Sequence, residues 1–241
     1  MQIFYSTQIT ENQIHISGDE FNHCKNVLRM KIGEEVNVAD GKGNVYHAKI
    51  GNFTKEKAEL QIISKSEQDL TNNNYTLHIV IAPTKNIERM EWFVEKAVEI
   101  GINEISFIIT KRTERKLINT ERLEKIAVSA MKQSGRAWLP IINPMQPFDK
   151  YITNTKNKNV KLVAHLIEGE KRVLLTDIAS KTDSKNKHFE LLIGPEGDFT
   201  TDEVQMALSS GFSAVSLGNA RLRTETAAIM GCATFAMILN S

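Results

Sequence analysis

The sequence has few cysteines and histidines, and it carries almost no net charge. Its two cysteines, Cys24 and Cys232, lie far apart and match no metal-ligand spacing, so we expect reduced core thiols in a cytoplasmic protein. The six histidines are equally scattered, and no metal site is predicted. Thirty basic residues against 29 acidic residues leave a formal charge of +1. A basic surface for a nucleic acid must therefore be local rather than a property of the whole chain.

Long apolar runs and the common nucleotide motifs are also absent. The longest nearly apolar run, Ala227 to Leu239, is too short to span a bilayer, and the opening residues MQIFYSTQIT do not have the pattern of a signal peptide. The sequence has no G-x-G-x-x-G in a strand-to-helix context, no Walker sequence and no G-x-S-x-G motif. These absences argue against a membrane protein, a dinucleotide oxidoreductase, a P-loop enzyme and a serine hydrolase.

The N-terminal part predicts several short strands and one helix. Strands are expected at residues 13–17, 35–40, 45–53 and 58–64, with the turn D-G-K-G-N between the second and the third. The sequence S-G-D-E, Ser17 to Glu20, predicts a capping box that opens a short helix toward Met30. Short strands with one helix are typical of a small barrel, here over residues 1–70. The polar stretch from Asp69 to Asn74 is the predicted linker.

The C-terminal part, residues 75–241, predicts strands that alternate with helices. Apolar strands are expected at residues 77–82, 104–110, 160–167, 189–193 and 214–217. Helices are expected from Ile87 to a stop at Gly101, around residues 123–131, from a T-T-D-E capping box at Thr200, and from an N-cap at Thr224 to the C-terminus. This alternation indicates an α/β fold with a mainly parallel sheet covered on both faces. Ligands bind such sheets at the carboxyl ends of the strands.

One glycine turn at such an end, I-G-P-E-G-D from Ile193, is acidic and contains no lysine. Gly194 and Gly197 permit a close backbone approach, and Pro195 fixes the turn. Glu196 disfavours a phosphate and favours a cation or ribose hydroxyls. A sulfonium cofactor, S-adenosylmethionine, meets these requirements, and a plain structural turn is the alternative.

A second turn, L-G-N-A-R-L-R-T-E-T-A-A from Leu217, combines arginines with the start of an apolar helix. The positive end of a helix dipole disfavours cations such as Arg221 and Arg223. Their presence indicates a ligand or a partner charge. The alternative is an internal pair of Arg223 with Glu225 or Glu196.

The only clearly basic tract runs from residue 111 to residue 136, with eight basic and three acidic residues. It begins with K-R-T-E-R-K and ends with Q-S-G-R at Arg136. Such a tract can neutralise RNA phosphates, and a solvated loop and helix face is the alternative. Trp138 is a candidate for base stacking or for a core role.

Together, I-G-P-E-G and L-G-x-x-x-L-R-T-E-T-A closely resemble the C-terminal signature of the RsmE family, ribosomal RNA small subunit methyltransferase E. This family belongs to the SPOUT superfamily. The stretch H-C-K-N-V-L-R-M-K-I-G from His23, with D-G-K-G from Asp40, is similar to the family's PUA-like barrel. E-K-A-V-E-I-G from Glu95 and Q-S-G-R also match, so the resemblance covers nearly the whole chain.

The resemblance implies a C-terminal SPOUT α/β domain with a deep trefoil knot, a PUA-like barrel that contacts RNA, and a homodimer. It also implies S-adenosylmethionine as cofactor and methylation of N3 of one uridine in 16S rRNA. Carried over by position, the cofactor-binding residues are Leu166, Gly194, Pro195, Glu196, Gly197, Leu217, Gly218, Leu222, Arg223 and Thr224. The expected RNA-binding residues are His23, Arg29, Lys111, Arg112, Arg115, Lys116 and Arg136. The chain departs from the family at Asp198, where glycine is frequent, and at Asn219 and Ala220, where Pro-Arg is frequent.

The reaction itself suggests the catalytic residues. Uridine N3 must lose a proton, and negative charge then develops on the flanking carbonyl oxygens, where an arginine stabilises it. Arg136 and Arg223 are the candidates, with Glu196 or Glu225 orienting the arginine, and no general base is assigned. Two alternatives remain open: a SPOUT enzyme for another rRNA or tRNA base, and a non-catalytic RNA-binding or assembly factor.

Overall fold

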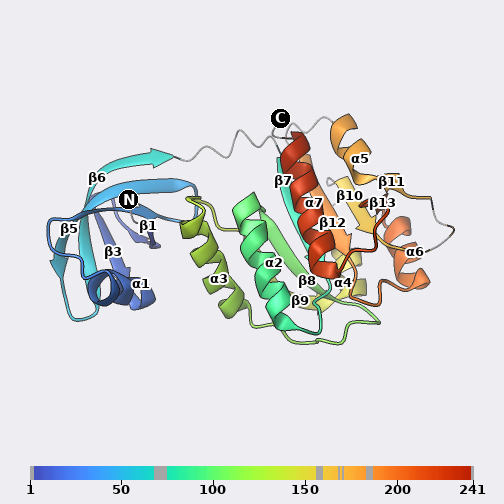
Figure 1. The fold of residues 1–241 in the computed structure, drawn as a ribbon, viewed down its shortest axis with the longest axis horizontal. Coiled ribbons are helices and arrows are strands. Elements are labelled where there is room, and N and C mark those ends of the chain that lie inside the picture. Colours follow the sequence, from blue (N-terminus) through green and yellow to red (C-terminus); the bar gives the residue numbers. More distant parts are fainter. Residues whose placement is uncertain are drawn as a thin grey trace. The chain divides into compact units, whose positions relative to one another are not determined.

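The chain forms two compact units in the computed structural model, which describes residues 3–67, 75–155, 160–167, 169, 171–182 and 187–239 (Figure 1). The first unit comprises Met1–Leu70 together with Val128–Leu139. The second unit comprises Thr71–Ala127 and Pro140–Ser241. The predicted linker, residues 69–74, lies outside the described residues. A segment distant in sequence is thus part of the N-terminal unit.

The first unit contains a six-stranded sheet. Its strands are β1 (Ile3–Tyr5), β2 (Gln8–Ile9), β3 (Gln13–Ser17), β4 (Glu35–Ala39), β5 (Asn44–Phe53) and β6 (Lys57–Glu67), in the order β1-β4-β5-β6-β3-β2. Among the described strands of this sheet, β1 and β4 alone pair in parallel. Phe4 of β1 and Ile14 of β3 share one core with Val38 and Ile50. Because strands near opposite edges share a core, the sheet curls into a half-barrel, as predicted.

A short helix follows β3, but the predicted capping box is wrong. Helix α1 (Gly18–Asn22) continues into a π-helical turn, η1 (His23–Val27), and the Ser17 side chain forms no cap hydrogen bond. The Glu20 carboxylate instead accepts a hydrogen bond from the Tyr5 amide at 3.0 Å and pairs with Lys132. The Glu20 carboxylate, which the capping box would place on the Ser17 amide, therefore binds residues distant in sequence instead.

The D-G-K-G-N turn binds the segment Ala137–Leu139. The Gly43 amide donates to the Ala137 carbonyl at 2.9 Å, and the Leu139 amide donates to the Gly41 carbonyl at 3.0 Å. Gly43 has a φ of 98°, and a Cβ there would lie 2.4 Å from the Trp138 ring. The turn therefore needs glycine both for its backbone and for the space beside Trp138.

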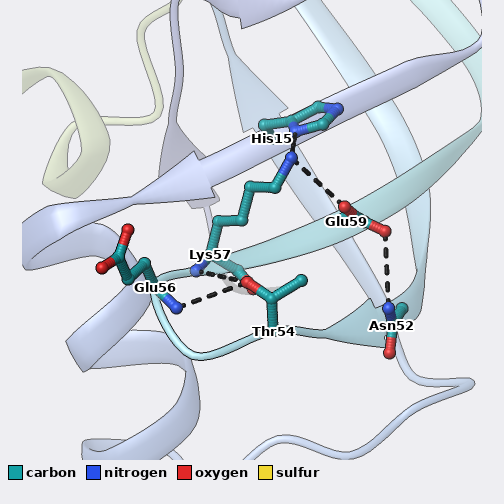
Figure 2. A network of polar contacts seen from close by, with 6 residues as sticks. All are labelled: His15, Asn52, Thr54, Glu56, Lys57 and Glu59. Atoms are coloured by element: carbon teal, nitrogen blue, oxygen red, sulfur yellow. Dashed lines mark hydrogen bonds and ion pairs between the residues drawn. The ribbon is translucent and has the colours of Figure 1, made fainter.

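The outer face of the same sheet carries a network of polar contacts (Figure 2). The Lys57 Nζ lies 2.7 Å from His15 Nδ1 and 3.2 Å from Glu59 Oε1, and Glu59 accepts from Asn52 Nδ2 at 3.5 Å. The hydrogen bond from Lys57 and that from Asn52 hold the pKa of Glu59 below its ordinary value. Lys57 is therefore neutralised by Glu59 rather than presented as a free cation.

The second unit contains a seven-stranded sheet in which every pair is parallel, as predicted. Its strands are β7 (Tyr75–Ile81), β8 (Glu104–Ile109), β9 (Ile141–Pro147), β10 (Val160–Ala164), β11 (Val173–Leu174), β12 (Lys187–Ile193) and β13 (Ser213–Ser216). The order is β11-β13-β10-β12-β7-β8-β9, so β10 lies between β12 and β13. The loops that follow these three strands consequently leave the same edge of the sheet side by side.

Helices cover both faces of this sheet. They are α2 (Ile87–Ile100), α4 (Phe148–Asn154), α5 (Leu175–Lys181), α6 (Thr201–Ser209) and α7 (Thr224–Leu239), and α3 (Thr120–Gln133) runs from the second unit into the first. Helices α2 and α5 pack beside α7 on one face (Figure 1). Tyr151 of α4 and Val204 of α6 pack with Val80 and Leu192 in the core of the other face.

Two predicted helix ends are confirmed and one is shifted. Gly101, at a φ of 109°, ends α2, and Thr200 forms a complete capping box with Glu203. Thr224 is the first residue of α7 rather than its N-cap, because the Arg223 carbonyl already accepts from the Ala227 amide at 2.8 Å. The trefoil knot stays a prediction.

Candidate active site

A cavity of about 290 Å³ lies in the second unit, where the loops after β10, β12 and β13 meet. Each loop contributes a lining residue: Leu166 follows β10, Gly194 follows β12, and Gly218 follows β13. Gly218 lines the cavity with a φ of 112°, and a Cβ added there would meet no atom within 4 Å, so its backbone is open to the cavity. The position of the cavity follows directly from the strand order.

Most of the predicted cofactor-binding residues line this cavity. They are Leu166, Gly194, Pro195, Glu196, Leu217, Gly218, Leu222, Arg223 and Thr224. Gly197 is not among them, and its carbonyl accepts from Arg112 Nη1 at 2.6 Å. The sequence reasoning did not identify His165, Arg172 and Asp198 as lining residues. Asp198 directly follows the G-P-E-G turn and departs from the glycine that is frequent in the family, whereas no local signal marks His165 or Arg172.

Glu196 is held by the backbone of a neighbouring loop. Its Oε1 accepts from the Lys85 amide at 2.9 Å, and the residue is exposed. Glu196 forms no pair with Arg223. The turn is thus fixed to the loop after β7, and the second carboxylate oxygen of Glu196 is available to a ligand.

Arg221 and Arg223 are both exposed and both line the cavity. Neither forms an ion pair with another described residue, so the proposed internal pairs of Arg223 with Glu196 or Glu225 are not formed. Glu225 does not line the cavity; it is buried, and its Oε1 lies 3.8 Å from Arg89 Nε. Within the described part of the chain, both arginines therefore keep an unpaired guanidinium at the cavity.

Comparison with known proteins identifies the family. Residues 71–236 match the profile of an RNA methyltransferase domain, and residues 16–63 match that of an RNA methyltransferase PUA domain. The ribosomal RNA small subunit methyltransferase E of Buchnera aphidicola subsp. Acyrthosiphon pisum is 30% identical over 95% of this chain and 90% of its own length. The chain belongs to the RsmE family.

Solved structures agree with this assignment. A probable rRNA-methyltransferase from Porphyromonas gingivalis is 37% identical, with a TM-score of 0.89 over 99% of this chain and 98% of that protein. The ribosomal RNA small subunit methyltransferase E of Neisseria gonorrhoeae, solved bound to S-adenosyl methionine, is 27% identical, with a TM-score of 0.81 over 97% and 95%. This RsmE-family chain therefore shares its whole fold with both proteins.

Within this RsmE-family chain, much of the predicted RNA-binding tract contacts the second unit itself. Lys111 Nζ pairs with Asp202 at 2.8 Å, and this hydrogen bond lowers the pKa of Asp202. Arg115 Nη2 donates to the Lys85 carbonyl at 2.6 Å. Since Arg112 holds Gly197, these three cations support other segments of the second unit, and the charge of Lys111 is offset by the Asp202 carboxylate. Their RNA-binding role, and that of Lys116, stays a prediction.

Arg136 belongs to the first unit, whereas the cavity belongs to the second. Gly135, at a φ of 69°, follows α3, and the Arg136 amide donates to the Met131 carbonyl at 3.0 Å. Also in the first unit, the His23 ring lies 6.0 Å from that of Phe4, and Arg29 is exposed with a φ of 53°. A role of Arg136 in catalysis and of all three residues in RNA binding stays a prediction.

Other reactive groups of this RsmE-family chain are sequestered. Burial raises the pKa of the Cys24 thiol to about 11 and that of Cys232 to about 12, and both cysteines are free.

Among the described residues, no three His, Cys, Asp or Glu side chains are grouped closely enough to hold a metal ion. No helix in the described part of the chain has the length and apolarity needed to cross a membrane.

Proposed function

We propose that this protein transfers a methyl group from S-adenosylmethionine to N3 of a uridine in small-subunit ribosomal RNA, acting in the cytoplasm. The observation that carries the proposal is the cavity built by the loops after β10, β12 and β13, two of which bear the I-G-P-E-G and L-R-T-E-T sequences. The small-subunit rRNA methyltransferase from Neisseria gonorrhoeae supports it, because that protein was solved with S-adenosyl methionine bound.

The residues of the cavity fit this cofactor. Glu196 supplies a carboxylate that favours a sulfonium and ribose hydroxyls, and no lysine occurs among the described lining residues. The arginines that line the cavity suit the carboxylate at the amino-acid end of the cofactor. Backbone groups at Gly194 and Gly218 can read a planar base edge. When bound, S-adenosylmethionine supplies the methyl group on its sulfonium sulfur.

The chain's own residues orient and stabilise the target uridine. The bound cofactor would supply the methyl group, and uridine N3 would accept it after giving up its proton to water, leaving the cofactor's sulfur as a neutral thioether. We assign Arg223 to stabilise the negative charge on the carbonyl oxygens beside N3, because it lines the cavity and forms no ion pair with Glu196 or Glu225. Holding the two reactants in line supplies much of the acceleration.

The protein is further proposed to act as a homodimer that binds RNA through its N-terminal unit. Trp92 of α2 and Met237 of α7 support the dimer, since both are large apolar side chains, 43% and 76% exposed, on helices that pack together. The match to an RNA methyltransferase PUA domain supports RNA binding by residues 16–63.

The decisive experiment is methyl transfer from labelled S-adenosylmethionine to small ribosomal subunits and to naked rRNA, followed by mapping of the modified nucleotide. A single N3-methyluridine in the small-subunit rRNA is expected. Methylation of another rRNA or tRNA base would instead support a different SPOUT target. If no nucleotide were methylated and S-adenosylmethionine caused no thermal shift, the protein would instead be a non-catalytic RNA-binding factor.

A further inference from the structure

Asp198 has an unusual backbone conformation for a residue with a side chain. Its φ is 62°, in the left-handed region, and among the described non-glycine residues only Arg29 shares this feature. Left-handed backbone favours glycine, which the RsmE family often has at this position, although aspartate tolerates it better than most residues. Some contact of the aspartate side chain must therefore offset the conformational cost.

The Asp198 carboxylate joins two loops that line the cavity. Its Oδ2 accepts from the Leu166 amide at 2.7 Å, across to the loop that follows β10. Its Oδ1 accepts from the Phe199 amide at 2.7 Å, and its own amide donates to the Pro195 carbonyl at 2.9 Å. The same residue thus closes the G-P-E-G turn and holds the neighbouring loop against it.

Two further features favour a positioning role over other roles. The Leu166 side chain is 46% exposed, so packing alone does not fix this loop. A Cβ at Gly194 would lie 3.2 Å from Asp198 Oδ1, so a side chain at Gly194 would crowd the carboxylate. Because each carboxylate oxygen already accepts from a backbone amide, Asp198 is poorly suited to take the proton from uridine N3.

We infer that Asp198 is a positioning residue that holds the Leu166 loop against the G-P-E-G turn and thereby shapes the cofactor cavity before the cofactor binds. The inference rests on the proposed function for the identity of the cofactor. The contact between the loops is a property of the free protein.

The test compares Asp198→Gly with Asp198→Asn in the full-length protein. Glycine suits the left-handed backbone, so the first variant removes the contacts without straining the fold. We expect the dissociation constant for S-adenosylmethionine, measured by calorimetry, to rise about tenfold, on the scale of one lost charge-assisted hydrogen bond. Turnover at saturating cofactor is expected to stay within about threefold of wild type. Asparagine keeps one acceptor oxygen and is expected to give a smaller rise.

Hydrogen exchange provides a readout that does not depend on the cofactor. The Leu166 amide in the cofactor-free protein is expected to exchange about tenfold faster in Asp198→Gly than in wild type. The matched control is Asp202→Asn, which changes an exposed aspartate of α6 that does not line the cavity and is expected to leave the dissociation constant unchanged.

Three results would overturn the inference: an unchanged dissociation constant with unchanged Leu166 exchange, a lower melting temperature with an unchanged dissociation constant, or a loss of turnover alone. Failure of the proposed function has a different signature. In that case wild-type protein would not bind S-adenosylmethionine, while Leu166 exchange would still show whether Asp198 holds the loop.

Discussion

Arg223 shows how a residue that is unfavourable for a helix can be suited to a ligand. It immediately precedes α7, where the helix dipole disfavours a cation, and it forms no ion pair with either nearby glutamate. Its guanidinium presents planar donors, which suit the coplanar carbonyl oxygens of a uracil better than a lysine ammonium would. The lack of an ion-pair partner for Arg223 among the described residues, rather than the presence of the arginine, favours a ligand.

Replacement of Arg223 with alanine is expected to lower kcat about a hundredfold, on the scale of a lost oxyanion donor. Arg223 is exposed, so the melting temperature should hardly change. Arg223→Lys keeps the positive charge but loses the planar guanidinium, so its kcat should lie between those of wild type and the alanine variant. Steady-state kinetics with saturating cofactor and RNA measures the effect. Near-normal turnover in the alanine variant would exclude Arg223 from the mechanism.

Gly43 offers a second test at the scale of one residue. Alanine there adds a Cβ 2.4 Å from the Trp138 ring at a φ of 98°. We expect the free energy of unfolding of the first unit to fall by about 2–4 kcal/mol, from overpacking and left-handed strain together. Urea unfolding followed by fluorescence in a Trp92→Phe background, where Trp138 is the sole tryptophan, measures this.

Gly18→Ala is the matched control for Gly43→Ala. Gly18 also has a positive φ, 60°, but an added Cβ would meet no atom within 4 Å. Gly18→Ala should therefore lower the free energy of unfolding by only about 1 kcal/mol, from backbone strain alone. Equal losses in the two variants would mean that the contact with Trp138 has no part in the effect.

At the scale of the element, the start of α6 is stabilised by a reciprocal cap. The Thr200 hydroxyl accepts from the Glu203 amide, and Glu203 also accepts from the Lys111 amide at 2.7 Å. Thr200→Ala should lower the free energy of unfolding by about 1 kcal/mol, whereas Thr200→Ser keeps the hydroxyl and should cost less than about half of that. Urea denaturation of the three proteins gives the comparison, and a fully stable alanine variant would contradict it.

Elements with strong local signals were predictable from the sequence. Helix α2 has apolar spacing and a terminal Gly101, and α6 has its capping box. Strand β9 has no such signal, because I-I-N-P-M-Q-P contains two prolines, which only an edge strand tolerates. The capping box predicted at Ser17 is wrong because contacts distant in sequence are not visible in a local pattern: Tyr5 and Lys132 bind the Glu20 carboxylate.

The candidate site was predictable where it follows from sequence motifs and not where it follows from strand order. The I-G-P-E-G and L-R-T-E-T turns identify two of the three loops. The roles of Arg172 and Asp198 depend on β10 lying between β12 and β13, which no local pattern specifies. Arg172 Nη1 donates to the His165 carbonyl at 2.6 Å, a contact that only the folded loop reveals.

At the scale of the whole molecule, each unit has a hydrophobic core of its own. Cofactor binding should therefore protect the two units unequally. At a cofactor concentration one hundred times its dissociation constant, we expect about 2.7 kcal/mol of added stability for the second unit. Amide hydrogen exchange of Leu191 in β12 against that of Ile14 in β3 measures the difference. Equal protection at both amides would mean that the two units unfold together.

The grouping of Ala137–Leu139 with the N-terminal unit has a consequence for chimaeric proteins. Gly41 and Gly43 bind this segment, which is separated from them by nearly one hundred positions of sequence. A chimaera that took residues 1–70 from one relative and the remainder from another would join one protein's glycine turn to the other's tryptophan segment. The inheritable module is therefore a pair of segments, and recombination at a single crossover would separate its halves.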